Sequence, residues 1–214
     1  MIPEQSVSLS VGADLSLEAR LALPPSPSAG VVMCHPHPLY GGDMDNPVVV
    51  RLQEVCAGLG LATLRFNFRG VGASGGVHAG GVGEQDDTAA ALDALAKAIP
   101  GGALAIAGYS FGARIAALVG GRDGRIRGLA LIAPPLAMYD FGFLEDKHVP
   151  TLVVAGTQDQ YCPPDDFARF TSAHPWVTPA TIEGADHFFF GKLFPLGEAV
   201  SGWARRLPRA GGTP

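Results

Sequence analysis

Short, uninterrupted apolar runs alternate with longer segments of helical periodicity along most of the chain. Two earlier segments, Ser6–Val11 and Leu15–Leu23, instead alternate apolar and polar residues, as strands with one exposed face do. Runs that are apolar at consecutive positions are typical of strands buried on both faces. Six such runs follow the turn at Pro24–Pro27: Gly30–Cys34, Ala62–Phe66, Ala103–Ala107, Ile126–Ile132, Pro150–Ala155 and Val177–Ile182.

The segments between these runs favour helices, which predicts a regular strand–helix order. This order is typical of a mostly parallel sheet with helices on both faces, so the predicted fold class is α/β. No repeat or linker interrupts the pattern, and we expect residues 1–214 to form a single domain. The predicted helices are Pro47–Ala57, Glu84–Ala98, Phe111–Val119, Pro164–Thr171 and Lys192–Arg206.

A candidate nucleophile lies where the strand Ala103–Ala107 meets the next helix. The pattern G-x-S-x-G runs from Gly108 to Gly112 and is centred on Ser110. A serine on such a tight turn has a strained backbone, and side chains two residues to either side would collide, which explains both glycines. The turn exposes the serine hydroxyl at the start of a helix. We therefore predict that Ser110 is a catalytic nucleophile.

A serine nucleophile needs a base within hydrogen-bond reach, and three histidines follow Ser110. Ligands of a parallel sheet bind beyond the carboxyl ends of its strands. His148 and His174 each precede a predicted strand, so they belong to the opposite edge. His187 follows the strand Val177–Ile182 and is the predicted base.

The acid that orients this base should follow another strand. Asp159 comes shortly after Pro150–Ala155, whereas Asp140 lies farther from the end of Ile126–Ile132. We favour Asp159 over Asp140, although an aspartate beside glycine is also a common turn residue. The resulting order Ser, Asp, His is the order of the triad in folds with this elbow. Asp186 adjoins the base in sequence and is expected to be solvated.

Two backbone N–H groups are candidates for binding an oxyanion. The Phe111 N–H lies at a helix N-terminus, where developing negative charge is stabilised. A second donor is expected after the strand Gly30–Cys34, where Pro36 and Pro38 carry no N–H. His37, Leu39 and Tyr40 remain, and we favour His37.

Four stretches combine into one pattern that spans nearly the whole chain: His35–Asn46, Arg65–Gly76, Gly108–Gly112 and Gly184–Phe189. This combination resembles a group of small, lidless bacterial α/β-hydrolases related to dienelactone hydrolases. The resemblance implies the α/β-hydrolase fold without a cap domain and a carboxylesterase-like activity. Dienelactone hydrolases use a cysteine nucleophile, and Ser110 stands in its place here, so their lactone activity is not implied.

Composition narrows the class of partner. A formal net charge of −5 and the absence of a basic stripe argue against nucleic acid. No apolar stretch is long enough for a membrane span, and the first residues lack the pattern of a signal peptide. Three sparse cysteines make no disulfide framework, so we expect a cytoplasmic protein. We predict a small-molecule ester substrate and allow for a homodimer, since the sequence does not fix the oligomeric state.

No cofactor or metal is expected. His35-x-His37 has metal-like spacing, but its flanking prolines and lack of a third ligand argue against a site. The glycine-rich loop Gly70–Gly76 lacks the ending of a phosphate-binding loop. We interpret it as a tight loop beside the oxyanion segment, anchored by Arg69. Cys34 is expected to be buried rather than reactive.

The leading hypothesis is a serine carboxylesterase that cleaves short-acyl esters through an acyl-enzyme. An acyltransferase or a peptidase could use the same triad, and a non-catalytic binding protein could retain the fold. The segment Ala133–Val149 is too short for a multi-helix lid. Its residues Met138, Tyr139, Phe141 and Phe143 could line an acyl pocket or simply pack. Phe188–Phe190 could add an apolar lip.

Overall fold

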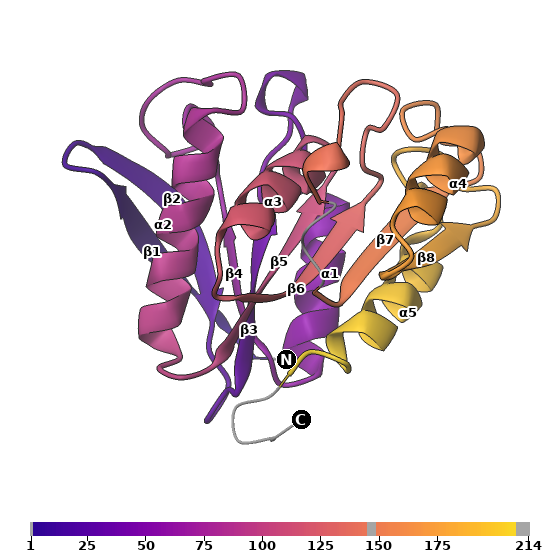
Figure 1. Ribbon diagram of the computed structural model, residues 1–214. Coiled ribbons are helices and arrows are strands. Elements are labelled where there is room, and N and C mark those ends of the chain that lie inside the picture. Colours follow the sequence, from indigo (N-terminus) through magenta and orange to yellow (C-terminus); the bar gives the residue numbers. More distant parts are fainter. Residues whose placement is uncertain (1, 145–148, 209–214) are drawn as a thin grey trace.

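A computed structural model describes residues 2–144 and 149–208, and its centre is an eight-stranded sheet (Figure 1). The strand order is β1-β2-β4-β3-β5-β6-β7-β8. The strands are β1 (Glu4–Val11), β2 (Leu15–Ala22), β3 (Ala29–Cys34), β4 (Ala62–Phe66), β5 (Ala103–Tyr109), β6 (Ile126–Ile132), β7 (Thr151–Gly156) and β8 (Val177–Ile182). Every predicted strand is present, with bounds within two residues of those expected.

The sheet is parallel from β4 through β8, and only the N-terminal hairpin departs from this direction. β1 pairs antiparallel with β2, which in turn pairs antiparallel with β4. β3 pairs in parallel with both β4 and β5, and β5 to β8 continue the parallel order. The predicted α/β class with a mostly parallel sheet is confirmed. Since the carboxyl ends of parallel strands meet at one edge, the loops after β3, β5, β7 and β8 share a common side.

Helices cover both faces of the sheet, as predicted (Figure 1). The helices are α1 (Pro47–Gly58), α2 (Gly83–Ala98), α3 (Phe111–Arg122), α4 (Pro164–Ala173) and α5 (Leu193–Ala204). One buried apolar cluster joins the sheet to α2, α3 and α4 through Leu92, Ile115 and Phe167. A second joins it to α1 and α5 through Leu52 and Trp203. Two 3₁₀ turns were not predicted, η1 (Pro38–Tyr40) and η2 (Gly142–Leu144).

Strand β8 is more exposed than its sequence predicted. The sequence indicated a strand buried on both faces, but only its two end residues, Val177 and Ile182, are buried. The reason is position, because β8 forms the outer edge of the sheet and pairs only with β7. Pro179 fits this place, since proline lacks the N–H that an inner strand would need on both sides.

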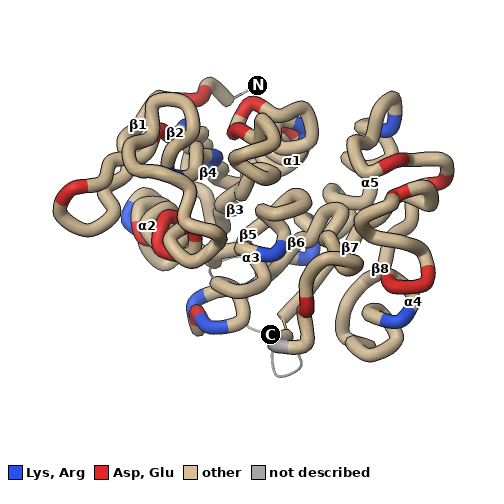
Figure 2. The backbone as a smooth tube through the Cα atoms, turned by 90° about the horizontal axis from the view of Figure 1, so that it is seen from above, with Lys and Arg blue, Asp and Glu red and all other residues tan. Residues whose placement is uncertain are grey.

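Charged residues are spread over the surface segments. Viewed from above, the blue Lys and Arg segments are separated from one another by tan and red segments (Figure 2). Over the part of the chain that the structure describes, no helix is long and apolar enough to span a bilayer.

Candidate active site

The turn between β5 and α3 gives Ser110 an unusual backbone. Ser110 has φ 56° and ψ −118°, a region that side-chain-bearing residues rarely occupy. A Cβ atom on Gly108 would lie 2.1 Å from the Gly112 carbonyl oxygen, and one on Gly112 would lie 2.2 Å from the Cys34 carbonyl oxygen. Backbone packs on backbone at both positions, so only glycine fits. The G-x-S-x-G pattern thus follows from steric contact on each side of Ser110.

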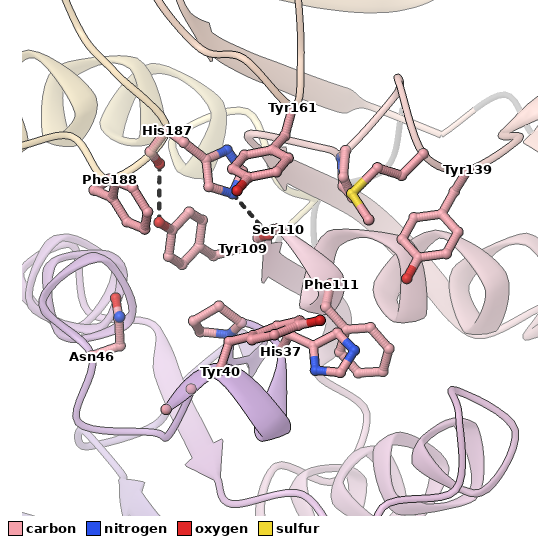
Figure 3. A pocket seen from close by; sticks show the side chains of 15 residues that line it. His37, Tyr40, Asn46, Tyr109, Ser110, Phe111, Tyr139, Tyr161, His187 and Phe188 are labelled. Atoms are coloured by element: carbon pink, nitrogen blue, oxygen red, sulfur yellow. Dashed lines mark hydrogen bonds between the residues drawn. The ribbon is translucent and has the colours of Figure 1, made fainter.

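Ser110, His187 and Asp159 form a continuous chain of hydrogen bonds. The Ser110 Oγ lies 2.9 Å from His187 Nε2 (Figure 3). The His187 Nδ1 lies 2.9 Å and 2.8 Å from the two carboxylate oxygens of Asp159. His187 is 6% exposed and Asp159 2% exposed, whereas Ser110 is half-buried. The structure therefore brings together the three residues expected from their positions after β5, β7 and β8.

Backbone donors fix the Asp159 carboxylate. Its Oδ1 accepts hydrogen bonds from the N–H of Tyr161 at 2.8 Å and of Cys162 at 3.0 Å. Across the site, the Tyr109 hydroxyl donates to the His187 carbonyl oxygen at 2.9 Å (Figure 3). These contacts were not predicted. Any residue type can supply a backbone N–H donor, so the sequence does not reveal one. Tyr109 occupies an x position of the G-x-S-x-G pattern, where the pattern does not specify the residue.

The two expected oxyanion donors border the site. Phe111 is the first residue of α3, so its N–H has no acceptor within the helix. In the loop after β3, the Leu39 N–H bonds to His37 Nδ1 and the Tyr40 N–H bonds to the His37 carbonyl oxygen. Among the described residues, the His37 N–H has no hydrogen-bond acceptor. Of the three N–H groups considered for this loop, that of His37 is left for a ligand.

A cavity of about 270 Å³ opens beside the Ser110 hydroxyl. All four tyrosines of the chain lie on its wall, so the surface is largely aromatic. Figure 3 shows the rings of Tyr40, Phe111 and His37 on one side and Tyr161 with His187 on the other. The lining residues are Pro36, His37, Tyr40, Gly41, Gly42, Asn46, Tyr109, Ser110, Phe111, Pro135, Met138, Tyr139, Tyr161, His187 and Phe188.

The candidate acyl-pocket residues divide between the cavity and the core. Met138 and Tyr139 line the cavity, and Arg114 holds the Tyr139 ring from 4.0 Å by a cation–π contact. Phe141 is buried and packs edge-on against Phe170. The Phe143 side chain lies outside the described part of the structure. Of Phe188–Phe190, only Phe188 lines the cavity, because Phe189 is fully buried and Phe190 is 78% exposed.

The alternative acids and bases lie elsewhere. Asp140 is exposed and accepts from the Gly142 N–H at 2.8 Å, as a turn residue does. His174 precedes β8 as expected, and its Nδ1 bonds to the Phe170 carbonyl oxygen. His148 lies outside the described residues. None of the alternatives that the structure describes reaches Ser110.

Asp186, the neighbour of the base in sequence, is a turn residue. It is half-buried, and its Oδ1 accepts from the Phe188 N–H at 3.0 Å and more weakly from the Phe190 N–H at 3.4 Å. Short aspartate side chains stabilise turns by this kind of bond two residues ahead. Asp186 therefore shapes the loop that carries His187.

The contacts of Cys34 and Arg69, the other residues singled out in the sequence, are those of structural residues. Cys34 is buried against Thr88, and burial raises the pKa of its thiol to about 12, so it stays protonated near neutral pH. Arg69 forms an ion pair with the fully buried Asp87 of α2, which anchors the glycine-rich loop as predicted. Within residues 2–144 and 149–208, no group of three His, Cys, Asp or Glu is placed to hold a metal ion.

Alanine at Gly112 is expected to unfold or strongly destabilise the protein. The new Cβ would stand 2.2 Å from the Cys34 carbonyl oxygen, which neither backbone can avoid without moving. We expect a loss above about 3 kcal/mol, or a Tm lower by roughly 10 °C, in thermal unfolding. Gly202→Ala is the control, because a Cβ there meets nothing within 4 Å on an exposed helical position. An unchanged Tm for Gly112→Ala would contradict the packing of the elbow described above.

Comparison with known proteins agrees with the fold. Residues 28–193 match the model of the alpha/beta hydrolase domain family. An uncharacterised protein of Rickettsia prowazekii (strain Madrid E) is 36% identical over 201 residues, covering 89% of this chain and 84% of its own length. The solved structure of an alpha-beta serine hydrolase homologue from Coxiella burnetii is 36% identical, with TM-score 0.85 over 92% of this chain and 96% of that one.

A further solved structure, from Xanthomonas campestris, is described as a serine hydrolase without a lid. It is 31% identical, with TM-score 0.85 over 100% of this chain and 98% of that one. The chain belongs to the alpha/beta hydrolase family, and it is similar to solved bacterial serine hydrolases, one of which is described as lacking a lid. The resemblance seen in the sequence, the fold and the absence of a cap domain are thereby confirmed.

Proposed function

We propose that this hydrolase is a serine carboxylesterase that cleaves short-acyl esters through an acyl-enzyme. The observation that carries the proposal is the hydrogen-bonded chain Ser110–His187–Asp159 beside an open cavity. A base in contact with the nucleophile, itself oriented by a buried carboxylate, is the arrangement that activates a serine hydroxyl.

In the acylation step, Ser110 Oγ attacks the ester carbonyl carbon while His187 Nε2 accepts the hydroxyl proton. Asp159 keeps the other ring proton on Nδ1, so that Nε2 is free to act as the base. The carbonyl oxygen becomes an oxyanion, which the N–H groups of Phe111 and His37 bind. The C–O bond to the alcohol then breaks, and His187 gives its proton to the departing alkoxide.

In the deacylation step, water replaces the alcohol. His187 Nε2 accepts a proton from water as its oxygen attacks the acyl carbon, and the same N–H groups bind the second oxyanion. Collapse of this intermediate releases the carboxylic acid and returns the proton to Ser110 Oγ. The Tyr109 hydroxyl, bonded to the His187 carbonyl oxygen, limits movement of the base between the two steps.

The direct test combines a fluorophosphonate probe with hydrolysis of p-nitrophenyl acetate. The proposal expects stoichiometric labelling at Ser110, located by peptide mass spectrometry, and steady-state hydrolysis after an initial burst. A binding protein that only retains the fold would neither label nor hydrolyse. Hydrolysis of amide analogues at rates above those of the matched esters would favour a peptidase instead.

A preference for short acyl chains is expected from the size and openness of the cavity. Its volume of about 270 Å³ suits a small ligand. Pro135, Met138 and Tyr139 of the segment between β6 and β7 line the cavity, and the described residues of this segment form no cap domain over it. Each CH₂ that stays in water forgoes about 0.8 kcal/mol of burial energy. Longer chains therefore gain little from binding.

The measurement is kcat/KM for p-nitrophenyl esters from acetyl to palmitoyl. We expect a maximum at acetyl to butyryl and no jump in rate when the substrate passes from monomer to emulsion. A maximum at long chains would contradict the prediction and would show that Phe188 and Met138 form a continuous acyl channel. Tributyrin across its solubility limit gives the second comparison under the same conditions.

A further inference from the structure

His35 is completely buried directly behind the loop that borders the cavity. It follows the last residue of β3 and is 0% exposed. Its ring packs edge-on against Phe68, with ring centroids 4.6 Å apart. The neighbouring histidine of the same motif, His37, lines the cavity instead. Two histidines that look alike in sequence therefore have different surroundings.

Both ring nitrogens of His35 have main-chain partners. The Phe68 N–H donates to His35 Nε2 at 3.0 Å, and His35 Nδ1 lies 2.6 Å from the Pro36 carbonyl oxygen. A backbone N–H can only donate, so Nε2 must be the unprotonated nitrogen. The proton of the neutral ring is then on Nδ1, which donates to the Pro36 carbonyl. Burial lowers the pKa of His35 to about 4, so the ring is neutral at pH 7.

The Pro36 carbonyl belongs to the same peptide unit as the His37 N–H. This peptide is trans, because the described chain contains no cis peptide bond. In a planar trans peptide the C=O and the N–H point in opposite directions. A hydrogen bond that holds the Pro36 oxygen toward the interior therefore turns the His37 N–H the other way.

Neighbouring backbone leaves this peptide little room. A Cβ on Gly42 would lie 2.2 Å from the Pro36 oxygen, and the Gly42 N–H donates to the His37 carbonyl oxygen at 3.1 Å. Pro36 and Pro38 restrict the backbone on either side of His37. Packing thus limits the loop, while the bond from His35 is the only hydrogen bond of the Pro36 oxygen among the described residues.

We propose that His35 is a positioning residue that sets the plane of the Pro36–His37 peptide and so aims the His37 N–H at the oxyanion of the reaction. His35 does not touch the substrate, and its action passes through one peptide unit. The proposal rests on the proposed esterase function for its catalytic consequence. Its structural part, the tautomer of His35 and the orientation of the peptide, is independent of any activity.

Two substitutions separate the two hydrogen bonds of His35. His35→Asn places an amide N–H near the position of Nδ1 and retains the donor to Pro36, but it loses the acceptor for Phe68. His35→Gln places an amide oxygen near the position of Nε2 and retains the acceptor for Phe68, but it loses the donor to Pro36. Both variants put a similar amide in the same buried site, so each serves as the control for the other.

We expect kcat for p-nitrophenyl acetate to fall about 10²-fold in His35→Gln, the loss typical for one oxyanion donor. KM should change less than about threefold, because a donor that acts on the oxyanion contributes mainly in the transition state. His35→Asn should stay within about tenfold of the wild-type kcat. Equal losses in both variants, or a change confined to KM, would show a merely structural role and overturn the proposal.

Two further measurements test the structural part without relying on turnover. The ¹⁵N chemical shifts of the imidazole in the wild-type protein at pH 7 should show His35 protonated on Nδ1, with the ring assigned through its contact with the Phe68 ring, whose centroid lies 4.6 Å away. An Nε2–H tautomer overturns the proposal even if neither variant folds. Crystal structures should show the Pro36–His37 peptide rotated in His35→Gln and retained in His35→Asn, and an unrotated peptide in both also overturns it.

The kinetic and structural measurements together distinguish a failure of the His35 proposal from a failure of the esterase proposal. If the wild-type protein neither hydrolyses esters nor labels at Ser110, the esterase proposal fails, while the tautomer and the peptide plane still decide the role of His35. If the wild type is active and both variants lose kcat equally, the esterase proposal stands and the role of His35 fails.

Discussion

Replacing Ser110 with alanine is expected to lower kcat for p-nitrophenyl acetate on the order of 10⁶-fold and to abolish fluorophosphonate labelling. In the proposed mechanism the Oγ atom bonds to the acyl carbon, and its hydrogen bond to His187 Nε2 at 2.9 Å has no substitute in alanine. The remaining N–H donors can polarise a carbonyl but cannot form an acyl-enzyme. Any residual rate should therefore lack the initial burst.

The same substitution should leave the fold intact. Ser110 is half-buried, and its own N–H bond to the Ile132 carbonyl oxygen does not involve the side chain. Circular dichroism and a Tm within a few degrees of wild type check this. Ser172→Ala on the exposed surface of α4 is the matched control and should keep full activity. Retention of more than a few per cent of activity in Ser110→Ala would mean that another residue is the nucleophile.

The fold class and the proximity of Ser110, Asp159 and His187 could both be predicted from the sequence, and the physical reason is the same for both. Apolar runs identify the inner strands, and parallel strands bring their carboxyl ends to one edge. Residues after β5, β7 and β8 then had to share a side, which placed Ser110, Asp159 and His187 together. The same reasoning placed His174 on the opposite edge, and the structure agrees.

Features that depend on side-chain packing or on place within the sheet were not predicted. The exposure of β8 follows from its edge position, which strand order decides and local composition does not. The bond from Tyr109 to the His187 carbonyl joins positions 78 residues apart and has no motif. The His35 ring is buried, whereas the His37 ring lines the cavity, and the conformation of the loop decides this difference. Such features depend on the three-dimensional packing of residues far apart in the sequence.

Asparagine at position 159 is expected to reduce kcat about 10⁴-fold, the effect known for losing the orienting carboxylate in serine proteases. In the wild type, the N–H groups of Tyr161 and Cys162 already donate to Asp159 Oδ1, so the amide oxygen of asparagine would keep that place. Its NH₂ group would then face His187 Nδ1, now forced to accept. The ring proton moves to Nε2, which can no longer take the proton of Ser110.

The loss of kcat in Asp159→Asn is thus expected to come from the wrong tautomer of His187 and not from unfolding. Asp140→Asn is the matched control. Asp140 is exposed and caps a turn through the Gly142 N–H, so its substitution should change kcat less than about threefold. Asp159→Asn should retain the wild-type Tm within a few degrees, and part of its activity should return at high pH, where hydroxide attacks without a general base. If Asp140→Asn were instead the inactive variant, the acid would belong to the loop after β6. The bond between His187 and Asp159 would then have to break during the reaction.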